Sequence, residues 1–211
     1  MKKCLLFIIS VFFFSKITNA QLNFKNETDS VKLKILIINS FDAQLMKARK
    51  SKKELFAALA DSLKQMLNFE LNERDKTEVI VIADVIKNPE NNDSIYFNLI
   101  NAYHASKAIV IKTLDAYFEQ TGVEVVKEVD GKKRTASYNI CSSANYFLYS
   151  RTSKVKESET KLCKFFTQRS VLSGFLAAGP DIVGKSKHAF KIIQENVKEY
   201  NKEISYYLRN D

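Results

Sequence analysis

The chain has 211 residues, of which 45% are hydrophobic and 27% charged, with five glycines and two prolines. This composition excludes an intrinsically disordered or collagen-like chain, and the length suits one ordinary domain with a hydrophobic core. The formal net charge is +9, but the cations do not form one dense block. The nearest approach to a basic patch, a candidate contact for nucleic acid or anionic lipid, is the group Lys47, Arg49, Lys50, Lys52 and Lys53. We expect this group to be a solvated helix start, and we expect no nucleic-acid partner.

The first twenty residues have the order of a secretory signal peptide. Lys2 and Lys3 precede an apolar run from Cys4 to Phe14, and the small residue Ala20 ends the segment. The apolar run is shorter than the roughly 20 residues that a membrane span needs. We therefore predict cleavage near Ala20 and a periplasmic or secreted product with no integral membrane span. An uncleaved anchor and a lipid anchor are the alternatives, although Cys4 precedes the apolar run and is badly placed for acylation.

Beyond a polar, flexible lead-in over residues 21–30, the first half of the chain alternates strand and helix. An Ile-rich run over 33–38 predicts a buried strand, and Ser51 with Glu54 predicts a capping box at the start of an amphipathic helix over 52–70. A second buried strand is predicted at 79–83. After a turn at 88–93, Asp93 or Ser94 caps a second helix, whose predicted inner face is Ile95, Leu99, Ile100 and Tyr103.

From residue 108 onward the apolar residues recur with a period of two, which predicts strands. The predicted strands are 108–118, 123–129, 135–150 and 154–167. Thr121-Gly122 and Asp130-Gly131 are the predicted turns between the first three of them, the second because Asp and Gly adopt positive φ at low cost. The middle of the chain is therefore an antiparallel meander.

Two cysteines, Cys141 and Cys163, follow the predicted signal peptide. If the strands 137–150 and 154–167 pair through a turn at 151–153, these cysteines lie nearly opposite each other, which favours a disulfide in an oxidising compartment. Two free, buried thiols are the alternative. A catalytic thiol is less favoured, because neither cysteine has a histidine nearby in the sequence.

The end of the chain returns to helical spacing. A helix over 169–178 is predicted to stop at Gly179-Pro180, and a final helix starts near Ser186. The whole order predicts an α+β fold, an α/β two-layer sandwich in which a mixed sheet with an antiparallel meander carries helices mainly on one face. No repeat or linker interrupts residues 31–208, which we expect to form a single globular domain.

One segment matches the phosphate-binding loop pattern G-x-x-x-x-G-K-[ST] through Gly179, Gly184, Lys185 and Ser186. In that loop, backbone N–H groups and the lysine hold phosphates, and the hydroxyl holds magnesium. The match is interpreted as coincidental, because a helix rather than a strand is predicted before it and too little chain follows for parallel strands. Ser186 is then a helix cap, and no cofactor is expected.

Few other residues suggest catalysis or metal binding. Asp42 and Asp84 follow predicted strands, where acid–base residues of α/β enzymes often lie, and His104 is their candidate partner. Loop and capping roles are the favoured interpretation. Neither His104 nor His188 has metal-ligand spacing to a second ligand, so no metal site is expected.

Aromatic residues occupy both faces of the predicted meander, as in the neighbouring pairs Tyr117 with Phe118 and Tyr146 with Phe147. One face is the core beneath the helices. The other face has to meet a helix of the same chain, a protein partner or a second copy in a homodimer.

The start of the predicted domain, Ile35-Leu36-Ile37-Ile38-Asn39-Ser40-Phe41-Asp42, is similar to the first strand of the periplasmic α/β modules of the TolB N-terminal, CsgG and LpoB type. With the order of elements after it, the resemblance spans about residues 31–205. It implies a non-enzymatic adaptor of the cell envelope, and no catalytic residue is carried over. The sequence lacks the lipid-anchor cysteine and has a Gly-Pro helical tail, which separates it from that group.

Three functions follow as hypotheses. The first is an envelope binding or assembly module that presents a sheet face or edge to a protein partner. The second is a secreted hydrolase that uses Asp42 and Asp84, which a deep pocket shared with His104 would favour. The third is a secreted ligand carrier, which a large closed apolar cavity would favour.

Overall fold

The structure is a computed structural model. It describes the backbone of residues 32–209 with gaps at 75, 89, 129–130 and 171–180. The predicted signal peptide and the lead-in over 21–30 lie outside the described residues. No helix in the described part of the chain combines the length and the apolar content that a bilayer span requires.

Five strands form one mixed sheet in the order β2-β1-β3-β4-β5. β1 pairs in parallel with both β2 and β3, whereas β3, β4 and β5 form an antiparallel meander. This confirms the α+β class and the predicted meander. The strands are β1 (Leu33–Asn39), β2 (Thr77–Val85), β3 (Lys107–Glu128), β4 (Gly131–Ser150) and β5 (Lys154–Ser170).

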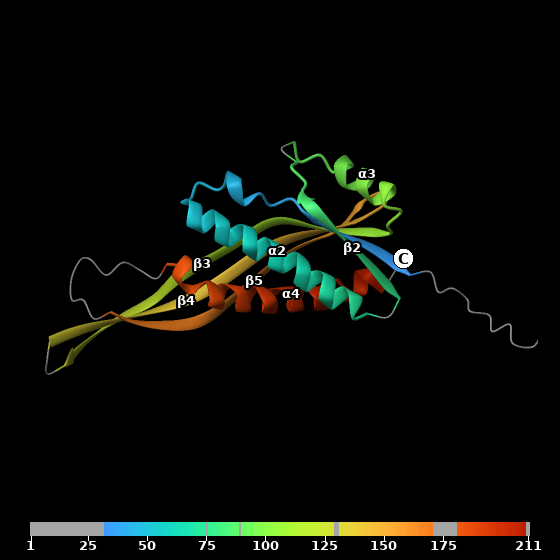
Figure 1. Ribbon diagram of the computed structural model, residues 1–211. Helices are drawn as coiled ribbons and strands as arrows, with labels where there is room; N and C mark the ends of the chain where they lie inside the picture. Colours follow the sequence, from blue (N-terminus) through green and yellow to red (C-terminus); the bar gives the residue numbers. More distant parts are fainter. Residues whose placement is uncertain (1–31, 75, 89, 129–130, 171–180, 210–211) are drawn as a thin grey trace, which may run out of the picture. The chain divides into compact units, whose positions relative to one another are not determined.

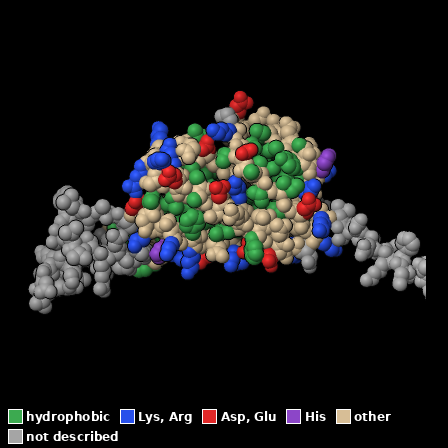
Figure 2. Space-filling view, viewed as in Figure 1, with side chains coloured by type: hydrophobic (Ala, Val, Ile, Leu, Met, Phe, Trp, Pro, Cys, Tyr) green, Lys and Arg blue, Asp and Glu red, His purple; other side chains and the backbone are tan. Residues whose placement is uncertain are grey.

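Helices cover the sheet mainly on one face, as predicted. The long helices α2 (Lys50–Asn72) and α4 (Ser186–Arg209) lie side by side on that face, and the short α3 (Ser94–Ala102) packs on the opposite face (Figure 1). Two 3-10 turns, η1 (Ala43–Leu45) and η2 (Val183–Lys185), precede α2 and α4. The space-filling view shows Lys and Arg side chains interspersed with acidic ones on this face (Figure 2).

Strand β1 is buried because it has helices on both faces. Ile35 and Ile37 contribute to the large core under α2 and α4, whereas Leu36 and Ile38 contribute to the smaller core under α3. A strand that is covered on both faces has no polar face, which explains its continuous apolar run.

The inner face of α3 differs from the prediction. Tyr96 and Ile100 are its fully buried residues, Ile95 and Leu99 are only partly buried, and Tyr103 is 41% exposed. Tyr96 was missed because its ring packs against Tyr149 of the distant strand β4, with ring centroids 5.0 Å apart, and helical periodicity in so short a segment does not reveal such a contact.

Two local predictions were wrong, and a third is contradicted only at its first two residues. α2 begins at Lys50 with Arg49 as its N-cap and no side-chain cap bond, so Ser51 and Glu54 form no capping box. β3 runs through Thr121-Gly122, where the register shifts between Gln120 and Gly122 as in a bulge rather than a turn. Residues 169–170 belong to β5, and the rest of the helix predicted over 169–178 lies outside the described residues.

Candidate functional site

The candidate site is the free edge of the sheet at β5, together with the groups that hold this strand in place. β5 has 17 residues and is an edge strand, with no further strand beyond it in the described part of the chain. An edge strand presents unpaired N–H and C=O groups that can bond to another extended chain.

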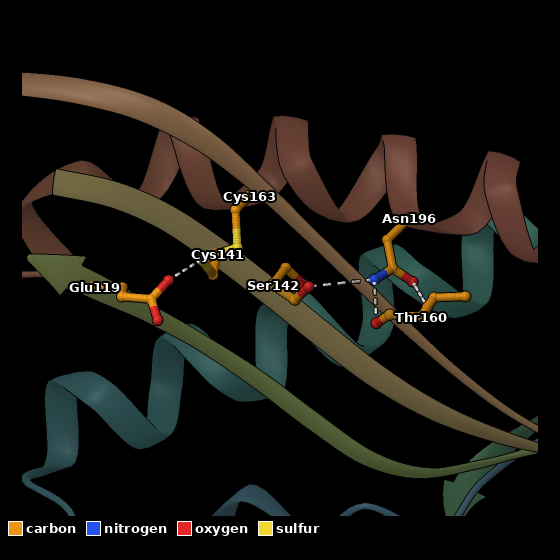
Figure 3. The surroundings of a disulfide bond; sticks show 6 residues. All are labelled: Glu119, Cys141, Ser142, Thr160, Cys163 and Asn196. Atoms are coloured by element: carbon orange, nitrogen blue, oxygen red, sulfur yellow. Dashed lines mark hydrogen bonds between the residues drawn. A yellow bond between two sulfur atoms is a disulfide. The ribbon is translucent and has the colours of Figure 1, made fainter. Parts of the chain in front are cut away.

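A disulfide joins β5 to β4. Cys141 and Cys163 lie directly opposite each other in the register, and the structure joins them through their sulfur atoms (Figure 3). Cys141 is fully buried, whereas Cys163 is exposed. The covalent link crosses the last ladder of the sheet, so it keeps the edge strand from separating from its neighbour.

The same pair shows which residues of β5 direct their backbone N–H and C=O groups away from β4. The Cα atoms of Cys141 and Cys163 are 4.1 Å apart, close to the roughly 4.5 Å of a non-hydrogen-bonded antiparallel pair and short of the roughly 5.5 Å of a hydrogen-bonded one. In a non-hydrogen-bonded pair the backbone groups point away from the partner strand. Cys163 therefore directs its N–H and C=O outward, and so do its neighbours at steps of two, Glu159, Lys161 and Phe165.

Helix α4 braces β5 from the core side through a buried asparagine. Asn196 is fully buried. Its amide donates to the carbonyls of Thr160 at 3.0 Å and Ser142 at 3.5 Å, and its oxygen accepts from the Thr160 hydroxyl (Figure 3). The same oxygen accepts from the Tyr146 hydroxyl at 3.0 Å. One side chain of α4 thus holds both β4 and β5.

Tyrosines surround this network. The rings of Tyr146 and Tyr200 stack with centroids 3.9 Å apart. Burial raises the pKa of Tyr146 and of Tyr200 above the usual tyrosine value. Both hydroxyls therefore stay protonated at neutral pH, and Tyr146 can act as a hydrogen-bond donor to Asn196.

Charged residues of β5 are neutralised by the same helix. Lys156 forms an ion pair with Glu203 at 3.3 Å, Ser158 donates to that carboxylate at 2.8 Å, and Lys164 pairs with Glu195. Exposed ion pairs stabilise a fold only slightly. They do leave fewer free charges on the core-side face of the edge.

Where the structure describes its side chains, the opposite face of the meander is not a broad aromatic surface. α3 covers Tyr149, while Lys112 and Lys154 lie over the ring of Phe147. The remaining outer positions of the three strands are mostly polar or charged, and Phe165, 69% exposed, is the large apolar side chain that stands out beside the disulfide. The sequence interpretation of two apolar faces was therefore incomplete, because α3 supplies part of the cover.

The structure places Asp42 and Asp84 at the carboxyl end of β1 and β2, but it leaves His104 at the other end of the sheet. His104 follows α3, and nearby Ser106 donates its N–H to Lys34 at the start of β1. The seven residues of β1 separate the two ends, a distance of roughly 20 Å. The three residues do not converge on one pocket.

Asp42 has a structural role in its own surroundings. Its carboxylate accepts the Gln44 N–H at 2.9 Å as the N-cap of η1, and it pairs with Lys87 at 3.3 Å. The hydrogen bond from the Gln44 backbone, followed by Lys87, lowers the pKa of Asp42. A pocket of about 170 Å³ is lined by Asp42 and Asp61 among others, and Asp84 is exposed outside it.

We expect Asp42→Ala to lower the free energy of unfolding by about 1 kcal/mol at pH 7, because it removes an N-cap. A carboxylate with a lowered folded-state pKa stabilises the fold above its unfolded-state pKa, and this stabilisation is lost as the pH falls through the lower value. The difference between the variant and the parent should therefore shrink as the pH falls below about 4 and vanish only below the lowered pKa of Asp42. Urea unfolding at pH 7 and at pH 3 measures the stability of the parent and of the variant. Asp84→Ala is the control, and it should change neither the stability at pH 7 nor its dependence on pH.

The segment with the phosphate-loop pattern is only partly described. Gly179 lies outside the described residues, Gly184 and Lys185 belong to η2, and Ser186 starts α4. The Asp181 carboxylate accepts the N–H of Val183 at 3.3 Å and pairs with Arg49. An acidic group at this helix start disfavours a phosphate there, and the role of Ser186 as a helix cap stays a prediction.

A second polar cluster was missed by the sequence analysis. The hydroxyls of Ser40 and Tyr96 are 2.8 Å apart, and Lys112 reaches the Tyr96 hydroxyl at 3.3 Å and Asn91 at 3.3 Å. These groups satisfy one another around the end of β1, so the cluster positions α3 on the sheet.

No family model matches this sequence, and no curated protein matches it. Similar solved structures include a protein described as a homolog of a neuraminyllactose-binding hemagglutinin from Helicobacter pylori, with 13% identity, a TM-score of 0.48 and coverage of 88% of this chain and 89% of that chain. A minor lipoprotein from Acinetobacter baumannii has 8% identity, a TM-score of 0.44 and coverage of 84% and 95%. Rare lipoprotein B from Shewanella oneidensis has 9% identity, a TM-score of 0.32 and coverage of 83% and 93%.

Proposed function

We propose that this chain is an exported, non-enzymatic binding module of the cell envelope that takes up an extended segment of a protein partner along the free edge of β5. The observation that carries the proposal is a 17-residue edge strand that is covalently tied to its neighbour. In this mode of recognition, backbone hydrogen bonds supply affinity and alternate side chains supply specificity. A rigid edge loses little entropy when the partner binds.

Export is part of the same proposal. Structural disulfides persist in the periplasm and outside the cell, and they are rare in the reducing cytosol. The Cys141–Cys163 bond therefore supports the signal peptide predicted over residues 1–20, with the mature domain predicted over 31–208.

The side chains of β5 define the chemistry of the segment that fits. Between Lys154 and Phe165 the strand has four lysines and two glutamates. Lys156 and Lys164 pair with glutamates of α4, and Lys154 pairs with Glu157. The remaining charges, Lys161 and Glu159, have opposite signs, so an extended segment that carries both signs of charge fits the edge. An apolar side chain near one end of that segment would cover the exposed ring of Phe165.

We expect Lys161→Pro to abolish binding of such a partner. Proline removes the outward N–H of residue 161, and an edge strand tolerates it because that N–H bonds to no other strand of the sheet. Capture from an envelope extract with the exported chain as bait, compared between variants, measures the effect. Lys161→Ala is the matched control, because it removes the same charge and keeps the N–H.

Partner capture should be lost with the proline variant and retained with the alanine variant, while both keep the parent melting temperature. Equal capture by the proline variant and the parent would contradict edge binding. Hydrolysis of a generic ester or glycoside by the purified chain, with no protein captured, would instead support the hydrolase.

A further inference from the structure

Three potential metal ligands meet on the outer face of the meander. The carboxylate of Glu119 on β3 and the sulfur atoms of Cys141 on β4 and Cys163 on β5 all lie within 4.8 Å of one another. A Glu119 carboxylate oxygen is 3.8 Å from the Cys141 sulfur (Figure 3). Each ligand comes from a different strand, so the sheet itself holds the three together.

The donor set matches one class of metal ion. Thiolate pairs with a third nitrogen or oxygen ligand are typical of Zn²⁺, with Zn–S near 2.3 Å and Zn–O near 2.0–2.2 Å. In a tetrahedral site with these bond lengths, ligand atoms lie about 3–4 Å apart. The two sulfur atoms can reach this separation by side-chain rotation once their mutual bond is broken.

The cluster is open to solvent on one side. Cys163 and Glu119 are exposed, while Cys141 is buried beneath them. An incoming thiol and a hydrated cation can therefore reach the sulfur of Cys163 without unfolding the sheet. Three protein ligands also leave a fourth position for water.

We propose that Cys141, Cys163 and Glu119 form a site for one thiophilic divalent cation when the disulfide is reduced. An external dithiol supplies two electrons: its thiolate attacks the Cys163 sulfur, the Cys141 sulfur leaves and takes a proton, and the second thiol of the reductant releases Cys163. The reductant becomes a disulfide. The cation then displaces two thiol protons and binds both sulfur atoms and the Glu119 carboxylate.

Disulfide and metal are mutually exclusive in this site, because both use the same sulfur electrons. The cation binds only the reduced chain, so it raises the midpoint potential of the cysteine pair. Each tenfold excess of metal over its dissociation constant corresponds to about 30 mV for this two-electron couple. The inference is independent of the partner proposed for β5.

Cobalt(II) is the probe for the test, because its thiolate complexes absorb strongly in the near ultraviolet. The exported chain is reduced with a dithiol, freed of reductant under argon and titrated with Co²⁺ and then with Zn²⁺. We expect one Co²⁺ per chain with a thiolate charge-transfer band, displacement by Zn²⁺, and no band in the oxidised chain. Glu119→Gln should weaken binding at least tenfold, whereas Glu159→Gln, which changes another exposed carboxylate of the meander, should leave it unchanged.

Circular dichroism recorded during the titration distinguishes a folded site from thiols of an unfolded chain. If reduction loosens the sheet, addition of Zn²⁺ should restore the spectrum in the parent and in Glu159→Gln but less so in Glu119→Gln. The absence of a charge-transfer band in the reduced chain would overturn the proposal. Equal affinities of the parent and Glu119→Gln would do the same.

Discussion

Asn196→Ala is expected to lower the free energy of unfolding by about 3–5 kcal/mol, because it removes four hydrogen bonds of a fully buried side chain at once. The Tyr146 hydroxyl loses its acceptor, the Thr160 hydroxyl keeps only the Ala144 carbonyl at 3.5 Å, and the carbonyls of Thr160 and Ser142 each lose one donor. All of the lost contacts lie between α4 and the β4–β5 ladder. Urea unfolding followed by circular dichroism measures the loss.

A double-mutant cycle with Tyr146→Phe tests the cause. If the unpaired Tyr146 hydroxyl contributes to the loss, the double variant should be more stable than the sum of the single effects predicts, by about 1–2 kcal/mol. Gln194 lies on the exposed face of the same helix turn. As the control, Gln194→Ala should change the free energy of unfolding by less than about 0.5 kcal/mol. A loss below about 1 kcal/mol for Asn196→Ala would show that the network does not hold α4 on the sheet.

Replacing both Cys141 and Cys163 with alanine is expected to destabilise the fold by about 3 kcal/mol in the chain-entropy model, since the bond closes a loop between residues 22 apart. For a chain of this size, such a loss lowers the melting temperature by roughly 6–12 °C. Differential scanning calorimetry in the presence of a chelator gives the shift, and the chelator prevents metal from stabilising any reduced parent.

Hydrogen exchange should locate the effect of that double variant. Amides of β5 and of the paired part of β4 should exchange faster, whereas those of β1 should not, because β1 is buried between helices on both sides. The reduced parent should melt at the same temperature as the variant. If the double variant had the same melting temperature as the oxidised parent, the disulfide would not stabilise the edge strand.

Much of the fold could be predicted from the sequence. The buried strand at β1, the long helix α2 and the helix α4 follow from apolar periodicity, which indicates the face of an element that is buried. In α4 the periodic residues form an apolar stripe of Ala189, Ile193, Val197, Tyr200, Ile204 and Leu208. The register that places Cys141 opposite Cys163 follows from the turn at 151–153. The turn and the period of two together fix the pairing register of a hairpin. A register shift of one residue would move every side chain of the strand to the other face of the sheet.

The site was less predictable, although one signal was present. Asn196 lies three residues after Ile193 and directly before Val197, within the apolar stripe of α4, and a lone amide in such a stripe indicates a buried hydrogen-bond network. Its partners on β4 and β5 are 36 to 54 residues away in the chain. No local pattern identifies partners at that separation.

Periodicity and turn chemistry by themselves determined most of the elements, the meander and the register that places the two cysteines opposite each other, because these depend on contacts between segments that are close in the chain. Only the tertiary structure decided that α3 covers the second face, that β5 is left at an edge, and that Glu119 comes beside the two cysteines. Each of these depends on which distant segments pack together, and that choice is set by the burial of whole faces rather than by any single stretch of residues.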